Sequence, residues 1–445
     1  MSSILDRTTP PDIQAPASFV VREPLRYDMP NGIPVYVLNA GESDVVRIDL
    51  LFEGGRWHQE QPLQALFTNR MLREGTDRFS SDEIARRLDY YGAWLELACA
   101  AEYTYLTLYS LGKYLPQTLD VLESIVKEPL FPQKEFEVVL ETNLRQFQVN
   151  SSKADTQASR RLMHVLFGSA HPLGHQLCED DYRRICPDVL RSFYRRYYHS
   201  SNCTVYLAGR IDEHCLRLVE ERFGAKPFGV GFKRAGHLEF QPVSATGSDF
   251  FIERKGSAQS AVRMGALSLS QHHPDYLKFR VLLTLFGGYF GSRLMSNIRE
   301  DKGYTYGISA GLLPYIGEGV LNIAADTACE YVRPLVHEVY AEMDRLQTEL
   351  VSDDELTRVR HYMLGDTCRS YESVFSLSDA WIFLQVSGLR RSYFAEVAQA
   401  INTVTPSELR DLAQKYLCKE TLKVVVCGEK IPKRRGSIPI IEDKL

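Results

Sequence analysis

The stretch Phe286–Gly307, FGGYFGSRLMSNIREDKGYTYG, organises the chain. Apolar residues at helical spacing precede it in the sequence, and it contains three closely spaced glycines, Gly287, Gly288 and Gly291. Glycine lets backbone closely approach another backbone or a ligand. The spacing after the glycines predicts a second helical segment that ends at Gly303, followed by a strand that begins near Tyr304. Arg299 and Tyr306 are therefore expected on either side of a helix-to-strand turn.

Such a pair can converge on one site. A guanidinium offers a rigid fork of donors to a carboxylate or a peptide carbonyl, and a phenol offers one directional donor to an oxyanion. The alternative is that Arg299 pairs on the surface with Glu300 or Asp301 while Tyr306 packs. Tyr304 competes with Tyr306 for the phenol role. Spacing alone leaves these alternatives open, because short patterns also match by accident.

Length and composition restrict the class of protein. A chain of 445 residues is too long for one ordinary core and suggests two or three domains. The net charge of -5, without a long basic run, gives no argument for nucleic acid or a membrane surface as a partner. No apolar segment is long enough to span a bilayer, and the N-terminus lacks the apolar run of a signal peptide. Nine cysteines without a C-x-x-C pair favour reduced thiols in a cytoplasmic protein.

The chain also repeats itself. Four residues of the first half recur at a constant offset of 219 in the second: Pro187, Leu190, Tyr197 and Gly209 as Pro406, Leu409, Tyr416 and Gly428. The repeat predicts two similar tandem α+β halves. The expected divisions are an N-terminal arm (1–22), a first domain (23–228), an exposed linker (229–249), a second domain (250–432) and a tail (433–445).

The motifs GG-x-x-x-SRL, IRE and GYTYG resemble the C-terminal half of the pitrilysin/insulinase family, the inverzincin metallopeptidases, and the resemblance extends from about Tyr27 to Gly428. It implies a clamshell in which each half is a β-sheet with helices packed on one face. In that family an Arg and a Tyr, seven positions apart, reach the substrate across a closed chamber, and these are Arg299 and Tyr306 here. The three glycines then either pack helices closely or line that chamber.

Active members carry H-x-x-E-H on a first-half helix, with two imidazoles on Zn²⁺ and a glutamate as general base. Met71–Thr76 resembles the residues that end that motif, and this likeness sets the alignment of the chain with the five motif positions. Leu66 and Arg70 then stand at the two histidine positions and Asn69 stands at the glutamate position. A guanidinium about 4 Å from a dication, at an effective dielectric constant near 20, is repelled by roughly 8 kcal/mol. The resemblance therefore implies a chain without its own metal.

The third ligand of active members is a downstream glutamate. Thr142 stands at that position, with Glu141 as an alternative one residue away. His171 and His175 have the spacing of a helical metal pair, but Pro172 and the following glycine oppose the helix that this spacing requires. No metal site is expected in this chain.

The resemblance implies a zinc-free subunit of a heterodimeric zinc metallopeptidase in a bacterial cytoplasm. Zinc is expected in a homologous partner subunit, while Arg299 and Tyr306 bind the peptide substrate and stabilise the transition state. An alternative is a structural subunit, similar to the core proteins of respiratory complexes. A third reading is a peptide binder that forms a homodimer in isolation.

Overall fold

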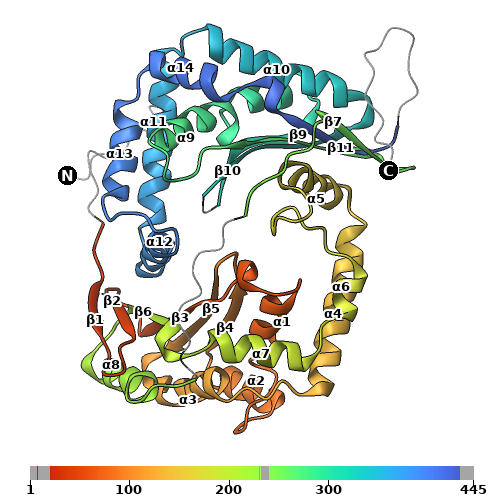
Figure 1. The fold of residues 1–445 in the computed structure, drawn as a ribbon. Coiled ribbons are helices and arrows are strands. Elements are labelled where there is room, and N and C mark those ends of the chain that lie inside the picture. The colour runs from red at the N-terminus through yellow and green to blue at the C-terminus, as the bar shows by residue number, and fades with distance from the viewer. Residues whose placement is uncertain (1–7, 9–20, 230, 232–239, 316, 431–445) are drawn as a thin grey trace, which may run out of the picture.

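The computed structural model describes the chain except for residues 1–7, 9–20, 230, 232–239, 316 and 431–445. Within the described residues, two halves are each built on one β-sheet (Figure 1). The expected tail, most of the expected arm and the middle of the expected linker lie outside the described residues. Residues 240–248 are described and lead into the second sheet, which begins at Asp249.

The first half contains a six-stranded sheet in the order β1-β2-β6-β3-β5-β4. Its strands are β1 (Leu25–Asp28), β2 (Pro34–Asn39), β3 (Val45–Glu53), β4 (Trp94–Cys99), β5 (Tyr103–Leu111) and β6 (Cys203–Gly209). Its helices are α1 (Gln64–Met71), α2 (Ser81–Tyr90), α3 (Leu115–Lys127), α4 (Gln133–Ser151), α5 (Ala154–Phe167), α6 (Glu179–Arg183), α7 (Pro187–Tyr197) and α8 (Glu213–Val219). Strand β4 lies at one edge, so one side of its backbone is unpaired within the sheet.

The second half contains a five-stranded sheet in the order β7-β11-β8-β10-β9. Its strands are β7 (Asp249–Glu253), β8 (Gln259–Ser268), β9 (Thr305–Pro314), β10 (Gly319–Ala328) and β11 (Lys423–Gly428). Its helices are α9 (Tyr276–Leu283), the π-helical turns η5 (Thr284–Gly288) and η6 (Met295–Asp301), α10 (Val332–Thr348), α11 (Asp353–Ser370), α12 (Val374–Val386), α13 (Tyr393–Thr403) and α14 (Pro406–Tyr416). Strand β9 lies at the edge and is thus the counterpart of β4.

The two halves repeat the same order of elements. Helices α7 and α14 begin at Pro187 and Pro406 and end at Tyr197 and Tyr416, which preserves the offset of 219. Each begins with proline, whose fixed φ suits the first helical turn. The predicted tandem α+β fold, with two similar sheet-and-helix halves, is confirmed.

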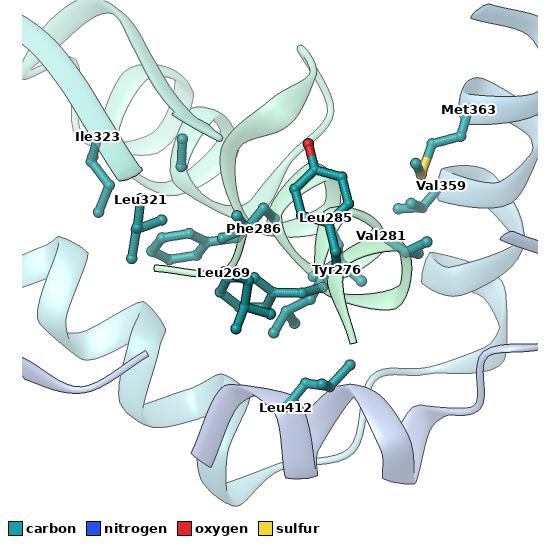
Figure 2. Packing of buried hydrophobic residues seen from close by; sticks show 14 of the residues in the cluster. Leu269, Tyr276, Val281, Leu285, Phe286, Leu321, Ile323, Val359, Met363 and Leu412 are labelled. Atoms are coloured by element: carbon teal, nitrogen blue, oxygen red, sulfur yellow. The ribbon is translucent and has the colours of Figure 1, made fainter. Parts of the chain in front are cut away.

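Each sheet buries one face under helices of its own half. In the first half, strand residues such as Ile48 and Leu207 share an apolar cluster with α3 and α7. In the second half, Leu321 and Ile323 of β10 pack with Phe286 of η5, as Figure 2 shows. Burial of these faces supplies most of the favourable free energy of folding.

The opposite face of each sheet receives a helix from the other half. Helix α12 of the second half packs on the first sheet, where the buried Arg47 forms ion pairs with Asp49 and with Asp379 of α12, the latter at 2.6 Å. The Tyr206 hydroxyl donates to Gln385 Oε1 at 2.5 Å. Figure 1 shows α12 between the two halves on one side. The contact therefore combines apolar packing with charged hydrogen bonds.

Helix α5 makes the reciprocal contact. Its residues Leu162 and Val165 pack against Val425 of β11 in one apolar cluster. Arg263 Nε of β8 donates to Ser159 Oγ of α5 at 3.1 Å. Since α5 and α12 are equivalent elements of the repeat, the halves exchange one helix each. This exchange fixes the two halves against one another on both sides of the molecule (Figure 1).

Within the described ranges, no helix has the length and apolar character needed to cross a bilayer. All nine cysteines are described and all are free thiols, as the cysteine spacing predicts.

Glu102, between β4 and β5, gives the stability of the fold a dependence on pH. The residue is 8% exposed, and burial followed by the charge of Glu53 raises the pKa of its carboxyl group from 4.5 to about 7. Between these values the folded state binds more protons than the unfolded state, so the free energy of unfolding falls as pH rises through this window. We expect Glu102→Gln to be more stable than wild type at pH 8 by roughly 2 kcal/mol and of similar stability at pH 4.5.

Urea unfolding at the two pH values measures this difference. A Glu102→Gln variant whose gain in stability is the same at pH 4.5 and pH 8 would contradict the assignment. Glu96→Gln, on the same sheet edge but exposed, serves as the control for a general change in charge.

Candidate functional site

Arg299 lies in the π-helical turn η6, before the helix-to-strand turn that the sequence predicts. Its guanidinium carbon is 4.7 Å from the ring centroid of Phe290, which is 61% exposed. Among the described residues no ion pair is recorded for Arg299, so the predicted alternative of pairing with Glu300 or Asp301 is not found. A cation over an aromatic face keeps its N–H donors available at the ring edge. Arg299 is therefore oriented by Phe290 and still able to bind an acceptor.

Two anchors hold η6 in place. Arg293, just before it, forms a bidentate pair with Glu355 of α11, at 2.8 and 2.9 Å. Lys302, just after it, pairs with Glu338 of α10 at 2.7 Å, and this contact lowers the pKa of Glu338. These ion pairs engage the flanking cations Arg293 and Lys302, whereas Arg299 forms no ion pair among the described residues. π-Helical turns are frequent at functional sites.

Tyr306 lies in a β-bulge at the start of β9. Tyr306 and Gly307 together stand opposite Asp326 of β10, where the register shifts. The Thr305 hydroxyl donates to the Asp326 carbonyl at 2.7 Å and accepts from the Gly307 N–H at 3.1 Å. As a result, two successive residues are exposed between the buried Thr305 and Ile308. Bulges re-aim side chains in this way, and Tyr306 is 89% exposed.

The two candidate phenols occupy different environments. The Tyr304 ring stacks on Tyr331, with centroids 5.0 Å apart and planes at 18°. It also packs against the apolar cluster of the second half. Tyr306 has no such contact and projects into solvent. The geometry therefore favours Tyr306 as the residue that can reach a ligand.

The three glycines differ in their surroundings. A Cβ on Gly287 would lie 2.7 Å from Ala310 Cβ of β9, so η5 and β9 approach too closely for any other residue. A Cβ on Gly288 or Gly291 would meet mainly their own neighbours Thr284 and Tyr289. Gly287 thus sets the distance between the turn and the strand that carries Tyr306, while Gly288 and Gly291 are exposed.

We expect Gly287→Ala to lower the free energy of unfolding by about 1–3 kcal/mol, because the added methyl group overpacks the contact with Ala310. Gly365→Ala is the matched comparison. No atom lies within 4 Å of a Cβ at Gly365, in the middle of α11, so this change should stabilise the chain by about 0.5–1 kcal/mol. Thermal unfolding of both variants measures the two effects. If Gly287→Ala leaves the free energy of unfolding unchanged, the contact between position 287 and Ala310 is not tight in solution.

The positions of the degenerate zinc motif lie on α1. Leu66 packs against the core of the first half, and Arg70 is exposed one helical turn later. Asn69 is fully buried; its Nδ2 donates to the Tyr105 carbonyl and the Tyr198 hydroxyl at 3.4 Å each. Burial lowers the pKa of Arg70, with Tyr182 opposing that effect. Arg70 nevertheless remains a cation where the family places a metal ligand.

Arg70 and Thr142 line one pocket of about 520 Å³ between α1, β4 and α4. Two positions of the degenerate zinc motif, Arg70 and Thr142, therefore lie beside the same pocket although they are far apart in sequence. Glu141, the alternative to Thr142, instead pairs with Arg145 on the exposed side of α4. Trp94 of the edge strand β4 also lines the pocket and is 66% exposed.

The donor set of this pocket does not fit zinc. Its acids are Glu74, which pairs with Arg73, and Glu96, and there is no histidine or cysteine among its lining residues. No cluster of three or more His, Cys, Asp or Glu suited to a metal occurs anywhere in the described part of the chain. His171, the other candidate, is buried against Phe167, and burial lowers its pKa. A site with Arg70 at its centre and no imidazole does not match tetrahedral Zn²⁺ coordination.

Sequence reasoning missed the residues that support the site. Phe290 orients Arg299, and Thr305 holds the bulge that exposes Tyr306. Gly307, directly after Tyr306, was the available signal for the bulge, because glycine inside a strand pattern often marks one.

Comparison with known proteins identifies the family of the chain and its fold. Residues 35–181 match the model for the insulinase family (peptidase family M16), and residues 184–363 match the model for the peptidase M16 inactive domain. The chain is 24% identical over 358 residues to the uncharacterized zinc protease YmxG of Bacillus subtilis, covering 79% of this chain and 85% of that protein. It is also 24% identical over 384 residues to the non-peptidase homolog YmxG of Helicobacter pylori, covering 83% and 85% of the two chains.

Among solved structures, the peptidase M16 inactive domain from Pseudomonas fluorescens superposes with a TM-score of 0.80 at 22% identity, covering 92% of this chain and 99% of that one. This likeness extends the agreement in fold to both halves. The two family models follow one another along the chain and together cover strands β2 to β6 of the first sheet, except Pro34, and the second half as far as residue 363. The chain therefore belongs to the insulinase (M16) family of peptidases, and residues 184–363 match the inactive-domain model of that family.

Proposed function

We propose that this chain is the zinc-free subunit of a heterodimeric zinc metallopeptidase and supplies Arg299 and Tyr306 to peptide bound at the zinc site of its partner. One observation carries the proposal. An arginine without a recorded ion pair and an 89% exposed phenol border one helix-to-strand turn, while the positions of the zinc motif hold no metal-binding set. The chain thus keeps the two residues proposed to bind substrate, Arg299 and Tyr306, and lacks the residues that would bind zinc.

Arg299 binds and positions the substrate. Its guanidinium, held over Phe290, presents two parallel N–H donors that suit a carbonyl or a carboxylate of the peptide. Because Phe290 and the two anchoring ion pairs restrict η6, little conformational entropy is lost when the peptide binds. The expected consequence is tighter binding and better alignment of the scissile bond.

Tyr306 donates a hydrogen bond to the oxygen that becomes negatively charged in the transition state. The bulge held by Thr305 sets the backbone at Tyr306, so that its side chain leaves the sheet on the exposed side, where a substrate can reach the hydroxyl. Zinc on the partner would polarise the carbonyl and supply the activated water. A donor that strengthens as charge develops on the oxygen raises kcat more than it lowers KM.

The edge strands offer a way to hold an extended peptide. Strand β9, which carries Tyr306, and strand β4, beside the Arg70 pocket, both have an unpaired edge. An extended peptide can add to such an edge through backbone hydrogen bonds, with side-chain pockets setting its register. In this chain the pocket beside β4 presents the Arg70 guanidinium where active relatives hold a metal, so a peptide held there would be bound and not cut.

A second candidate is a structural or peptide-binding subunit without a role in proteolysis. The relative in Helicobacter pylori is described as a non-peptidase homolog, which favours this candidate. Both candidates are consistent with the nine free thiols of the chain. They differ in whether Arg299 and Tyr306 affect peptide hydrolysis by a partner.

Association tests the shared premise of a partner. The chain is purified alone and mixed with a zinc-bearing family member from the same organism, and the molar mass is measured by size-exclusion chromatography with light scattering. We expect a 1:1 complex that contains one zinc ion per heterodimer. A chain that remains a homodimer in the mixture, without binding the zinc-bearing protein, would contradict the proposal.

A further inference from the structure

A second pocket lies in the second half, away from the turn that carries Arg299. Its volume is about 400 Å³, and it is an open pocket lined by residues of α9, α11, α12, α13 and the end of β9. Its lining is aromatic on several sides, with Tyr371 of the α11–α12 turn, Phe383 of α12 and Phe394 of α13. The Tyr371 and Phe394 rings meet edge to face, with centroids 5.1 Å apart. These walls suit a flat or branched apolar group.

One cation points into this aromatic pocket. Arg280 of α9 is partly buried, and its Nη1 donates to the Tyr393 hydroxyl oxygen at 3.4 Å. The carboxylate that lines the pocket, Asp366, pairs instead with Arg369 at 2.6 Å. Across the described residues no ion pair is recorded for Arg280. A partly buried guanidinium without a carboxylate is poorly compensated and favours an anionic ligand.

The phenols of the pocket remain hydrogen-bond donors. Burial raises the pKa of Tyr276 to about 12 and that of Tyr371 to about 12, and it also raises the pKa of Tyr393. Tyr393 accepts from Arg280 through its oxygen, so its own proton is free to be donated. Tyr276 and Tyr393 are 4% and 7% exposed, which keeps their hydroxyls in place. The Arg280 guanidinium and the Tyr393 hydroxyl therefore lie next to each other in the lining of this pocket.

We propose that this pocket binds a small organic carboxylate carrying an aromatic or branched apolar group. The carboxylate accepts from Arg280 and from the Tyr393 hydroxyl, while the apolar group packs against Phe383, Phe394 and Tyr371. A free metabolite and the C-terminus of a peptide share this chemistry. The site is separate from the peptidase proposal and does not depend on a partner subunit.

Isothermal titration calorimetry of the full chain tests this. The probes are N-acetylphenylalanine, its amide, acetate, and the peptide Ala-Ala-Ala-Phe with a free carboxylate. We expect N-acetylphenylalanine to bind at least about tenfold more tightly than its amide and than acetate, because each lacks one of the two recognised groups. Binding of the peptide as tightly as N-acetylphenylalanine identifies a peptide C-terminus as the ligand, and much weaker binding of the peptide identifies a free small molecule.

Variants separate the site from non-specific binding. Arg280→Gln should weaken N-acetylphenylalanine about tenfold or more, and Tyr393→Phe should weaken it by a smaller factor. Arg333→Gln, on the exposed face of α10, is the matched control and should bind as wild type does. If Arg280→Gln does not fold, the proposal is tested by two other measurements. These are the affinity of Tyr393→Phe for N-acetylphenylalanine and the affinity of the wild-type chain for N-acetylphenylalanine compared with its amide. Equal binding of acid and amide, or no binding of either at millimolar concentration, would overturn the proposal.

Discussion

In a complex with a zinc-bearing family member, Tyr306→Phe is expected to lower kcat for peptide hydrolysis by about 10²-fold, and Arg299→Ala to lower kcat/KM by about 10–100-fold, mainly through KM. Tyr306→Phe removes one donor to the developing oxyanion, so its effect falls on the transition state. Under the proposed mechanism, Arg299→Ala removes two donors that would contact the peptide already in the ground-state complex. Steady-state kinetics on a single fluorogenic peptide separates the two effects.

The controls for these variants lie next to the site. Tyr304→Phe changes the phenol that stacks on Tyr331 and should leave kcat within about twofold of wild type, since the ring contact persists. Arg299→Lys keeps the charge without the fork and should fall between wild type and Arg299→Ala. Thermal unfolding should be unchanged in Tyr306→Phe, because the side chain is 89% exposed. If Tyr304→Phe lowers kcat as much as Tyr306→Phe does, the assignment of the phenol role to Tyr306 is wrong.

The second large effect concerns metal binding by the first half. The wild-type chain is expected to bind no zinc, whereas the triple variant Leu66→His, Arg70→His, Thr142→Glu should bind one zinc ion. Positions 66 and 70 are one helical turn apart on α1, and positions 70 and 142 line the same pocket. At a zinc concentration 100 times the dissociation constant, binding should stabilise the variant by about 2.7 kcal/mol. Elemental analysis after dialysis and a zinc-dependent rise in Tm are the two readouts.

The matched control keeps the arginine. Leu66→His with Thr142→Glu, in which Arg70 remains, should bind no zinc, because a guanidinium about 4 Å from the metal is repelled by roughly 8 kcal/mol. Asn69 is left unchanged in both variants, since it corresponds to the general base and its burial leaves little room for a longer side chain. Zinc bound equally by the triple variant and the control would show that Arg70 does not exclude the metal.

The tandem fold was accessible from sequence because the repeat keeps both composition and spacing. Pro187 and Pro406 begin equivalent helices, and Gly209 and Gly428 end equivalent strands. The positions of Arg70 and Thr142 in the degenerate zinc motif were inferred from the resemblance of two local motifs to the insulinase family. The structure brings those two residues to one pocket.

The exchange of α5 and α12 between the halves could not be predicted in this way. Each helix buries an apolar face, and that pattern is the same whether the helix packs on its own sheet or on the equivalent sheet of the other half. The aromatic pocket around Arg280 depends on that tertiary arrangement, because its walls come from segments far apart in sequence. The bulge at Tyr306 depends on the register with β10, which a single strand pattern does not specify.

The central claim is that this chain contributes to peptide hydrolysis only through a zinc-bearing partner. The most direct measurement is the initial rate of hydrolysis of a mixed peptide pool by this chain alone, by the zinc-bearing homologue alone, and by the two together at equal concentration. The account predicts negligible hydrolysis by either chain alone and at least about 10²-fold faster hydrolysis by the mixture. A mixture no faster than the zinc-bearing homologue alone would contradict it and leave the structural or peptide-binding role.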